Sequence, residues 1–329
     1  MSRTVVVGDI HGCFAELAEL LGALRLRPDD VLVAAGDVVD RGPSPGAVVD
    51  FLRSRPRTVV VMGNHERKHV RGIFSYAQEI TRLQLGDHYA STVEWMSNLP
   101  YFFENEHLRV VHAAMLSGIP LAGQKEEILC GSTSGEKELT ALFPGDHWYN
   151  RYADAKPVAV GHHVVGPSPM ILDGRIFCLD TGACHGGRLT ALSVPDFTIH
   201  SVDARADHWS IVKGEWQLPV LKQKEWLDFT WTQLDEAVAR SSADPSVSCW
   251  LAAVSAWAAG LRAQVPALAG AARTLAGELS IEQMRRHPAA SVLFQARNGR
   301  INLDRQCSTP RRTIALAAAL EVVTADLPA

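Results

Sequence analysis

Three short polar segments, each placed directly after an apolar run, constrain the fold of this chain more than any other feature. They read GDIHG at residues 8–12, GDVVDRG at 36–42 and GNHE at 63–66. The runs before them, at 4–7, 31–35 and 58–62, are short and mostly β-branched, as buried strands are. Apolar residues at helical spacing follow the first segment, and Ser44-Pro45 is typical of a helix start after the second. This β-α-β-α-β order predicts an α/β sheet with helical crossovers.

Further strands are expected later in the chain, at 108–111, 157–160, 176–179, 190–194 and 197–202. Little helix separates the last three, which favours a second, mainly antiparallel sheet packed on the first. The long insertions at 67–106 and 121–156 are expected to be helix and loop.

Composition shifts after about Val202, and residues 224–282 carry Trp, Leu and many Ala at helical spacing. We predict two regions: an α/β domain at 1–205 and a mainly helical C-terminal appendage at 206–329. The α/β domain is expected to be a β-sandwich of two mixed sheets flanked by helices.

The charge balance limits the classes of protein that this chain can belong to. With 32 Lys and Arg against 36 Asp and Glu, the net charge of -4 excludes a wholly basic nucleic-acid binder, but not a local basic patch. The start of the chain lacks a signal-peptide pattern, and no stretch approaches the roughly 20 apolar residues that span a bilayer. Six scattered cysteines without a C-x-x-C pair argue against a disulfide framework and a thiolate zinc site. We expect a cytoplasmic protein without a membrane partner.

The polar segments carry residue types that bind hard or borderline divalent metals. Because ligand sites in open α/β sheets lie at the carboxyl ends of strands, these side chains should converge. Asp37 has two carboxylate oxygens and can bridge two ions. Six donors can hold two metals and leave positions for water and substrate. The candidate ligands are Asp9, His11, Asp37, Asn64, His112 and His162.

The three segments, in this order and at these spacings, resemble the phosphoprotein phosphatase branch of the calcineurin-like metallophosphoesterases. That branch includes protein Ser/Thr phosphatases, bacterial and phage relatives, and symmetrical diadenosine tetraphosphatases. LDTGAC at 179–184 and GGRLT at 186–190 extend the resemblance and are similar to bacterial Ser/Thr phosphatases and diadenosine tetraphosphatases. The resemblance covers roughly residues 4–202, so the domain at 1–205 would be the catalytic one.

What the resemblance implies can be placed on individual residues. Asp9 and His11 would hold the first ion, Asp37 would bridge, and Asn64, His112 and His162 would complete the second. The ions would be Mn²⁺ first, with Fe, Zn, Ni or Co as alternatives. A hydroxide bridging them would attack phosphorus, because metal-bound water ionises near neutral pH.

The remaining roles concern the leaving group and the phosphate. His65, oriented by Asp40, would act as general acid. Arg41 would bind the phosphate oxygens with its planar fork, beside Asn64. Arg151, in the Trp148–Arg151 stretch, is expected to add a second phosphate contact.

The sequence departs from the family pattern at two places. His112-Ala113-Ala114 stands where relatives usually have His-Ala-Gly, and His163 follows His162 where Thr is usual. His163 could support the ligands or compete as one. Glu66 is expected to cap a helix or to hydrogen-bond behind the site.

Three functions are compatible with these features. We predict a metal-dependent phosphatase acting on phosphomonoesters, protein phosphoserine and phosphothreonine among them. A dinucleoside polyphosphate hydrolase is the first alternative. The second is a non-catalytic or RNA-binding module, against which the intact His65, Asp40 and Arg41 argue. Its basic face would consist of Arg285, Arg286, Arg297, Arg300, Arg305, Arg311 and Arg312. The partner would be a phosphorylated protein, nucleotide or small molecule.

Overall fold

The computed structural model describes residues 3–239 and 244–329. By its internal contacts the chain divides into an N-terminal unit, Met1–Trp216, and a C-terminal unit, Gln217–Ala329. The catalytic boundary at residue 205 stays a prediction. Among the described residues, no helix is both long and apolar enough to cross a membrane.

The first sheet of the N-terminal unit is built on three parallel strands. β1, β2 and β3 pair in parallel, and helices α1 (Phe14–Ala23) and α2 (Pro45–Ser54) connect them. The predicted β-α-β-α-β order is therefore confirmed. The path through the sheet is β11-β10-β1-β2-β3, and β9 pairs with β10. Its strands are β1 (Thr4–Val7), β2 (Val31–Ala34), β3 (Thr58–Val60), β9 (Asp180–Thr181), β10 (Arg188–Val194) and β11 (Thr198–Asp203).

The second sheet runs in the order β4-β5-β6-β8-β7. Its central pairings, β5 with β6 and β6 with β8, are parallel, and its two edge pairings are antiparallel. The prediction of two mixed sheets is confirmed, whereas the prediction of a mainly antiparallel second sheet is wrong. The strands are β4 (Phe102–Glu104), β5 (Arg109–Val111), β6 (Val158–Val160), β7 (Met170–Leu172) and β8 (Ile176–Cys178).

Our prediction placed the last two expected strands, at 190–194 and 197–202, in the second sheet, which is wrong. β10 pairs antiparallel with β1, with Thr4 opposite Val194, and β11 pairs antiparallel with β10. They extend the first sheet because β10 completes the backbone hydrogen bonds along the edge of β1 that would otherwise be open.

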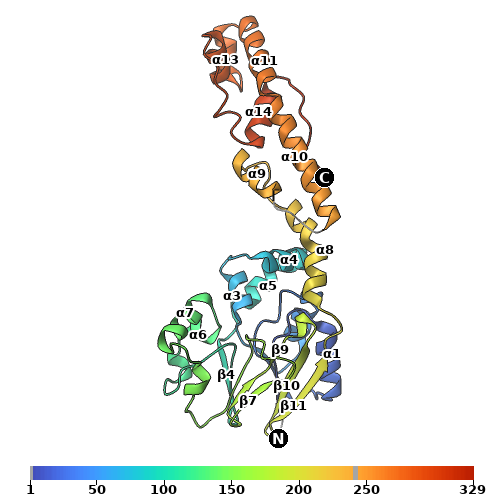
Figure 1. Cartoon of the computed structure of the whole chain (residues 1–329), viewed down its shortest axis with the longest axis vertical. Helices are drawn as coiled ribbons and strands as arrows, with labels where there is room; N and C mark the ends of the chain where they lie inside the picture. The colour runs from blue at the N-terminus through green and yellow to red at the C-terminus, as the bar shows by residue number, and fades with distance from the viewer. Residues whose placement is uncertain (1–2, 240–243) are drawn as a thin grey trace. The chain divides into compact units, whose positions relative to one another are not determined.

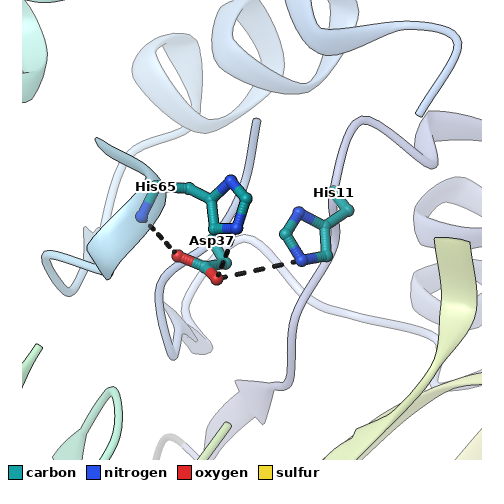
Figure 2. Close-up of side chains that lie close together, drawn as sticks. All are labelled: His11, Asp37 and His65. Carbon is teal, nitrogen blue, oxygen red and sulfur yellow. Dashed lines mark hydrogen bonds and ion pairs between the residues drawn. The ribbon is translucent and has the colours of Figure 1, made fainter. Parts of the chain in front are cut away.

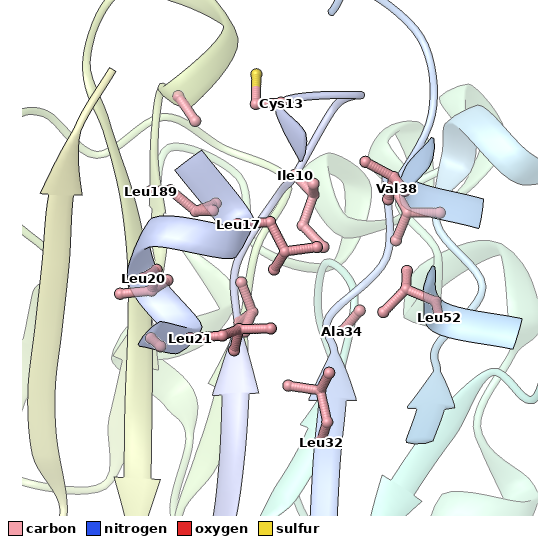
Figure 3. Close-up of a cluster of buried hydrophobic side chains, with 14 of the residues drawn as sticks. Ile10, Cys13, Leu17, Leu20, Leu21, Leu32, Ala34, Val38, Leu52 and Leu189 are labelled. Atoms are coloured by element: carbon pink, nitrogen blue, oxygen red, sulfur yellow. The ribbon is translucent and has the colours of Figure 1, made fainter. Parts of the chain in front are cut away.

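Alternation along the strands produces the layers of the sandwich (Figure 1). Val5 and Val7 of β1 join a core between the first sheet and the helices α1 and α2, while Val6 faces a second core. That second core also holds Val110 and Phe177, so it lies between the two sheets. Figure 3 shows the helix-facing core, with Leu17, Leu20 and Leu21 of α1 packed over the strands.

The two insertions are mostly helical and irregular, as predicted, although the first also contains strand β4. The first contains α3 (Asn64–Val70), α4 (Tyr76–Leu85), η1 (Gly86–His88) and α5 (Tyr89–Met96). The second contains η2 (Leu121–Gly123), α6 (Glu126–Leu129), α7 (Thr133–Leu142) and η3 (Trp148–Arg151), and η4 (Ala183–His185) follows β9. Leu121, Ile128, Leu129 and Leu139 pack on the outer face of the second sheet.

The C-terminal unit is helical in its described residues, as expected, and the division between the units falls inside α8 (His208–Lys222). Trp226, Trp250 and Trp257 are buried together in one of its cores, so their rings serve packing. Its further helices are α9 (Trp231–Val238), α10 (Pro245–Ala263), α11 (Val265–Glu278), α12 (Ile281–Arg286), α13 (Ala290–Arg297) and α14 (Pro310–Ala319).

Asp30, in the turn before β2, is expected to make the N-terminal unit sensitive to acid. Burial would raise the pKa of this carboxyl, but hydrogen bonds from Arg27 and Arg3 lower it from 3.8 to about 2. Because the folded-state pKa is depressed, the stabilisation is complete above about pH 4 and is lost as the pH falls toward 2. Asp30→Asn should lower the free energy of unfolding by about 2 kcal/mol at pH 7, and the difference should shrink with acid.

Urea unfolding of both proteins between pH 7 and pH 3 measures this difference. Asp50→Asn, at an exposed position on α2, is the matched control and should have no such effect. A difference from wild type that stayed constant with pH would show that Asp30 acts by packing rather than by charge.

Candidate metal and phosphate site

The strand ends of the two sheets bring the predicted side chains together. His11 follows β1, Asp37 follows β2, and His112 and His162 follow β5 and β6. Asp37 belongs to two groups of potential metal ligands. Within each group, the ligand atoms all lie within 4.8 Å of one another. His11 and His65 form one group with Asp37, as Figure 2 shows, and His112 and His162 form the other. The arrangement resembles a carboxylate placed between two clusters of imidazole nitrogens.

Asn64, at the start of α3, connects the histidines of the second group. Its side-chain oxygen lies 3.1 Å from His112 Nε2 and 3.1 Å from His162 Nδ1. His112 Nε2 is also 3.4 Å from Asp37 Oδ2, while its Nδ1 donates to the Ala35 carbonyl. Burial lowers the pKa of His112, but the Asp37 carboxylate raises it to about 10. In the metal-free protein this imidazole therefore carries a proton that a metal would have to displace.

Asp9 approaches the site from the end of β1, against the loop after β6. Both carboxylate oxygens accept from the backbone N–H of His162 at 3.1 Å. Burial raises the pKa of Asp9 well above its ordinary value, and repulsion from Asp180 and Asp37 raises it further. Three carboxylates thus share one buried region, where a cation would relieve their repulsion.

The backbone of the site is held in an unusual conformation. Five predicted site residues have positive φ although they carry side chains, which costs about 1–3 kcal/mol each and is concentrated at functional sites. They are His11, Asp37, Asp40, Arg41 and His162. Gly36, with φ at 104°, fits only as glycine, because a Cβ there would lie 2.6 Å from His112 Nδ1.

His65 and Asp40 form a buried pair. His65 Nδ1 lies 2.6 Å from Asp40 Oδ2, and its Nε2 is 3.8 Å from Asp37 Oδ2. Asp40 also accepts from His69 Nε2 at 2.9 Å and from the Gln78 amide. Burial alone would raise the pKa of Asp40, but the hydrogen bonds from His65 and His69 hold it well below its ordinary value. Asp40 is therefore a carboxylate that fixes the His65 ring with Nε2 toward the site.

Arg41, in the loop after β2, contacts His11, which forms one group of potential ligands with Asp37 and His65. Its Nη1 donates to His11 Nε2 at 3.1 Å, while His11 Nδ1 donates to the Val39 carbonyl at 2.9 Å. Burial, together with the neighbouring His65, lowers the pKa of His11 to about 3. His11 is therefore neutral, with a lone pair on Nε2, which is the form that binds metals.

Glu66 braces the loop that carries Asp37. This buried carboxylate accepts from the backbone N–H groups of Asp37 and Val38 at 2.9 Å and of Gly63 at 3.1 Å. The predicted role in capping and hydrogen bonding is confirmed by these contacts. Since Gly63 is the N-cap of α3, Glu66 joins that helix start to the end of β2.

Three supporting residues were missed by sequence reasoning. His69 lies four residues after His65, on the same face of α3, and that spacing is a signal that could have identified it. Gln78 forms a capping box with Ser75 at the start of α4, which gives no sign of its contact with Asp40, and Glu136 lies in α7 without a motif. Glu136 Oε1 is 3.1 Å from His162 Nε2 and 3.4 Å from His163 Nε2. His163 is thus joined to Glu136, in a separate group from those that share Asp37.

Arg151 has an acidic partner within the N-terminal unit, and the arginines of residues 285–312 belong to the C-terminal unit. Arg151 Nε pairs with Asp146 Oδ2 at 2.8 Å and is largely exposed, so its phosphate contact stays a prediction. Arg286 pairs with Glu282 and Arg311 with Asp228. Arg305 and Arg312 line a cavity of about 510 Å³ in the C-terminal unit, and RNA binding there stays a prediction.

Comparisons with known proteins place this chain beside one family and several relatives. Residues 2–184 match the model of the family described as calcineurin-like phosphoesterase. An asymmetrical bis(5'-nucleosyl)-tetraphosphatase, PrpE, from Geobacillus thermodenitrificans is 28% identical over 240 residues, which cover 62% of this chain and 95% of that protein. A symmetrical bis(5'-nucleosyl)-tetraphosphatase from Methylococcus capsulatus is 31% identical over 151 residues, covering 43% of this chain and 50% of that one. A crystal structure described as a candidate diadenosine tetraphosphatase has a TM-score of 0.52 and 27% identity, covering 62% of this chain and 94% of that chain.

Proposed function

Because this chain belongs to the family of calcineurin-like phosphoesterases, we propose that it is a two-metal hydrolase of phosphoanhydrides, with dinucleoside polyphosphates as its substrate class. The main support for metal dependence is that the Asp37 carboxylate belongs to both groups of histidine ligands. Relatives named as bis(5'-nucleosyl)-tetraphosphatases support the substrate class. This ranking reverses the one drawn from sequence alone, in which phosphomonoesters came first.

The donors fit a pair of hard or borderline divalent ions. Asp9, His11 and Asp37 would hold one ion, and Asp37, Asn64, His112 and His162 the other; all are oxygen or imidazole donors. The gathered carboxylates around Asp9 and the neutral His11 support this assignment. Mn²⁺ is the expected metal, with Fe, Zn, Ni or Co as alternatives. When bound, such ions acidify water and neutralise charge on the phosphate.

The chain's own groups position the substrate and move a proton. We assign His65 Nε2 to the leaving oxygen, because Asp40 holds Nδ1 at 2.6 Å and turns the other nitrogen inward. Arg41, half-buried beside His11, would bind two phosphate oxygens with its planar guanidinium. Arg151 would add a further contact after leaving Asp146.

A cavity next to the site supports a nucleoside-bearing substrate. It has a volume of about 760 Å³ and reaches Gly161 and His163, beside the ligand His162. Trp148 and Tyr149 line it, and His147 stacks on Tyr149 with ring centroids 4.8 Å apart at 13°. Aromatic faces of this kind bind nucleobases by stacking.

Phosphomonoesters are the second candidate, and the short His65–Asp40 contact favours them. An alkoxide leaving group needs protonation more than a phosphate leaving group does, so an oriented acid is most useful on an alkyl ester.

A substrate panel with the full-length protein and Mn²⁺ separates the two candidates. We expect diadenosine tetraphosphate to have a kcat/KM about 100-fold above that of p-nitrophenyl phosphate or a phosphoserine peptide, since the nucleotide halves contribute binding energy. Chromatography of the products shows whether cleavage is symmetrical. Higher turnover of the phosphopeptide would favour the second candidate, and no metal-stimulated hydrolysis of any substrate would overturn both.

A further inference from the structure

A second cavity, of about 420 Å³, lies between α3 and the start of α7, within the N-terminal unit. Its volume is in the range of small-molecule sites. Four of its lining side chains are cationic, and hydroxyl groups from the first residues of α7 complete the wall. The cationic residues are Arg67, Lys68, Arg71 and Lys137.

This cationic cavity borders the candidate metal site. Asn64 lines it and also places its side-chain oxygen 3.1 Å from His112 Nε2. Gly131, another wall residue, has φ at 65° and presses its backbone against His162: a Cβ there would lie 2.6 Å from His162 Nε2. A group bound in the cavity would therefore be next to a phosphate held at the metal site.

The charge of the cavity is only partly neutralised. Glu127 contacts Arg67 and lies 3.6 Å from Arg71 Nη2. Although burial lowers the pKa of Arg67, hydrogen bonds to Tyr101 and Glu127 raise it overall, so this guanidinium is permanently charged. Within residues 3–239 and 244–329, neither Lys68 nor Lys137 forms a salt bridge. Two lysine ammonium groups are thus available for an anion.

We propose that the cationic cavity binds the phosphate groups of a polyphosphate chain that lie beyond the phosphorus under attack. This inference rests on the proposed function and specifies how the substrate class is selected. A phosphomonoester ends at the metal site and gains nothing from Lys68 and Lys137, whereas a longer phosphate chain places two or more negative groups beside them. The N–H groups at the start of α7 add to the attraction.

The double variant Lys68→Ala/Lys137→Ala tests this selection by kinetics. We expect the KM for diadenosine tetraphosphate to rise roughly tenfold with kcat little changed, because the lost contacts are made away from the reacting phosphorus. For p-nitrophenyl phosphate, both constants should stay within about twofold. The matched control, Arg53→Ala/Lys213→Ala, removes two exposed cations elsewhere on the same unit and should match wild type on both substrates.

Direct binding separates this inference from the proposed function. Calorimetry of metal-free protein should show inorganic tripolyphosphate binding that weakens roughly tenfold in the Lys68→Ala/Lys137→Ala variant but not in the control. Orthophosphate should bind more weakly than tripolyphosphate and be insensitive to the variant. If tripolyphosphate bound but no anhydride were hydrolysed, the assignment of the cavity would be supported and the proposed function would be overturned.

Two results would overturn the cavity assignment. One is an unchanged KM for diadenosine tetraphosphate together with unchanged tripolyphosphate binding in the double variant. The other is a larger effect of the variant on a phosphoserine peptide than on the dinucleotide, which would assign the cavity to acidic peptide side chains. Circular dichroism confirms folding, and Lys68→Gln/Lys137→Gln repeats the charge loss with longer side chains.

Discussion

Asp37→Asn is expected to lose bound metal and hydrolytic activity together. Asp37 Oδ2 lies 3.4 Å from His112 Nε2 and 3.8 Å from both His11 Nε2 and His65 Nε2, so one oxygen serves both groups of donors. An amide in its place removes the negative charge that both ions would share. We expect metal affinity to fall more than about 100-fold, beyond the effect of losing a supporting group, and kcat/KM to fall on the order of 1,000-fold.

The fold should survive this change. Asp37 Oδ1 accepts from the His65 backbone N–H at 3.0 Å, and an asparagine oxygen can accept the same bond. Inductively coupled plasma mass spectrometry of protein loaded with Mn²⁺ measures the metal, and Asp173→Asn, at an exposed loop carboxylate, is the control. Retention of two metal equivalents per chain in Asp37→Asn would contradict the bridging assignment.

His65→Ala is expected to keep metal and lose most turnover. The loss should be roughly 100- to 10,000-fold on an unactivated alkyl phosphate and much smaller on p-nitrophenyl phosphate, whose leaving group needs little protonation. Asp40 would still accept from His69 and Gln78, so the variant leaves no unpaired buried carboxylate.

Two comparisons make the His65 result interpretable. His88→Ala, at an exposed position in η1, should keep wild-type rates on every substrate. Metal content measured alongside the rates distinguishes loss of an acid from loss of a ligand. A near wild-type rate of His65→Ala on the alkyl ester would contradict the general-acid assignment, and loss of metal would place His65 among the ligands.

The sequence predicted the parts of the site that lie at strand ends. His11, Asp37, Asn64 and His112 each follow a short apolar run, and parallel strands bring such positions to one edge of a sheet. Glu136 and Gln78 could not be foreseen, because each comes from a helix whose placement depends on tertiary packing. No local pattern in their neighbourhoods indicates that they reach His162 or Asp40.

The fold was predictable to a similar depth. The valines of β1 predict a buried strand, and the helical pattern that follows them predicts a helical connection to the next parallel strand. Residues 190–194 show a strand equally well, but nothing in them indicates a partner, so assignment to the second sheet was wrong. β4 and β7 were missed because each lies at an edge of its sheet and contains no fully buried residue, so neither forms the buried apolar run that marked the other strands.

The left-handed residues of the candidate site have a consequence for engineering. Glycine adopts such a conformation freely, so a selection for heat resistance alone would favour glycine at position 41, where the side chain is only half-buried. That replacement would delete the guanidinium beside His11. Thermostability and turnover are therefore opposed at this loop position, and a screen that scores only melting temperature would select proteins that have lost activity.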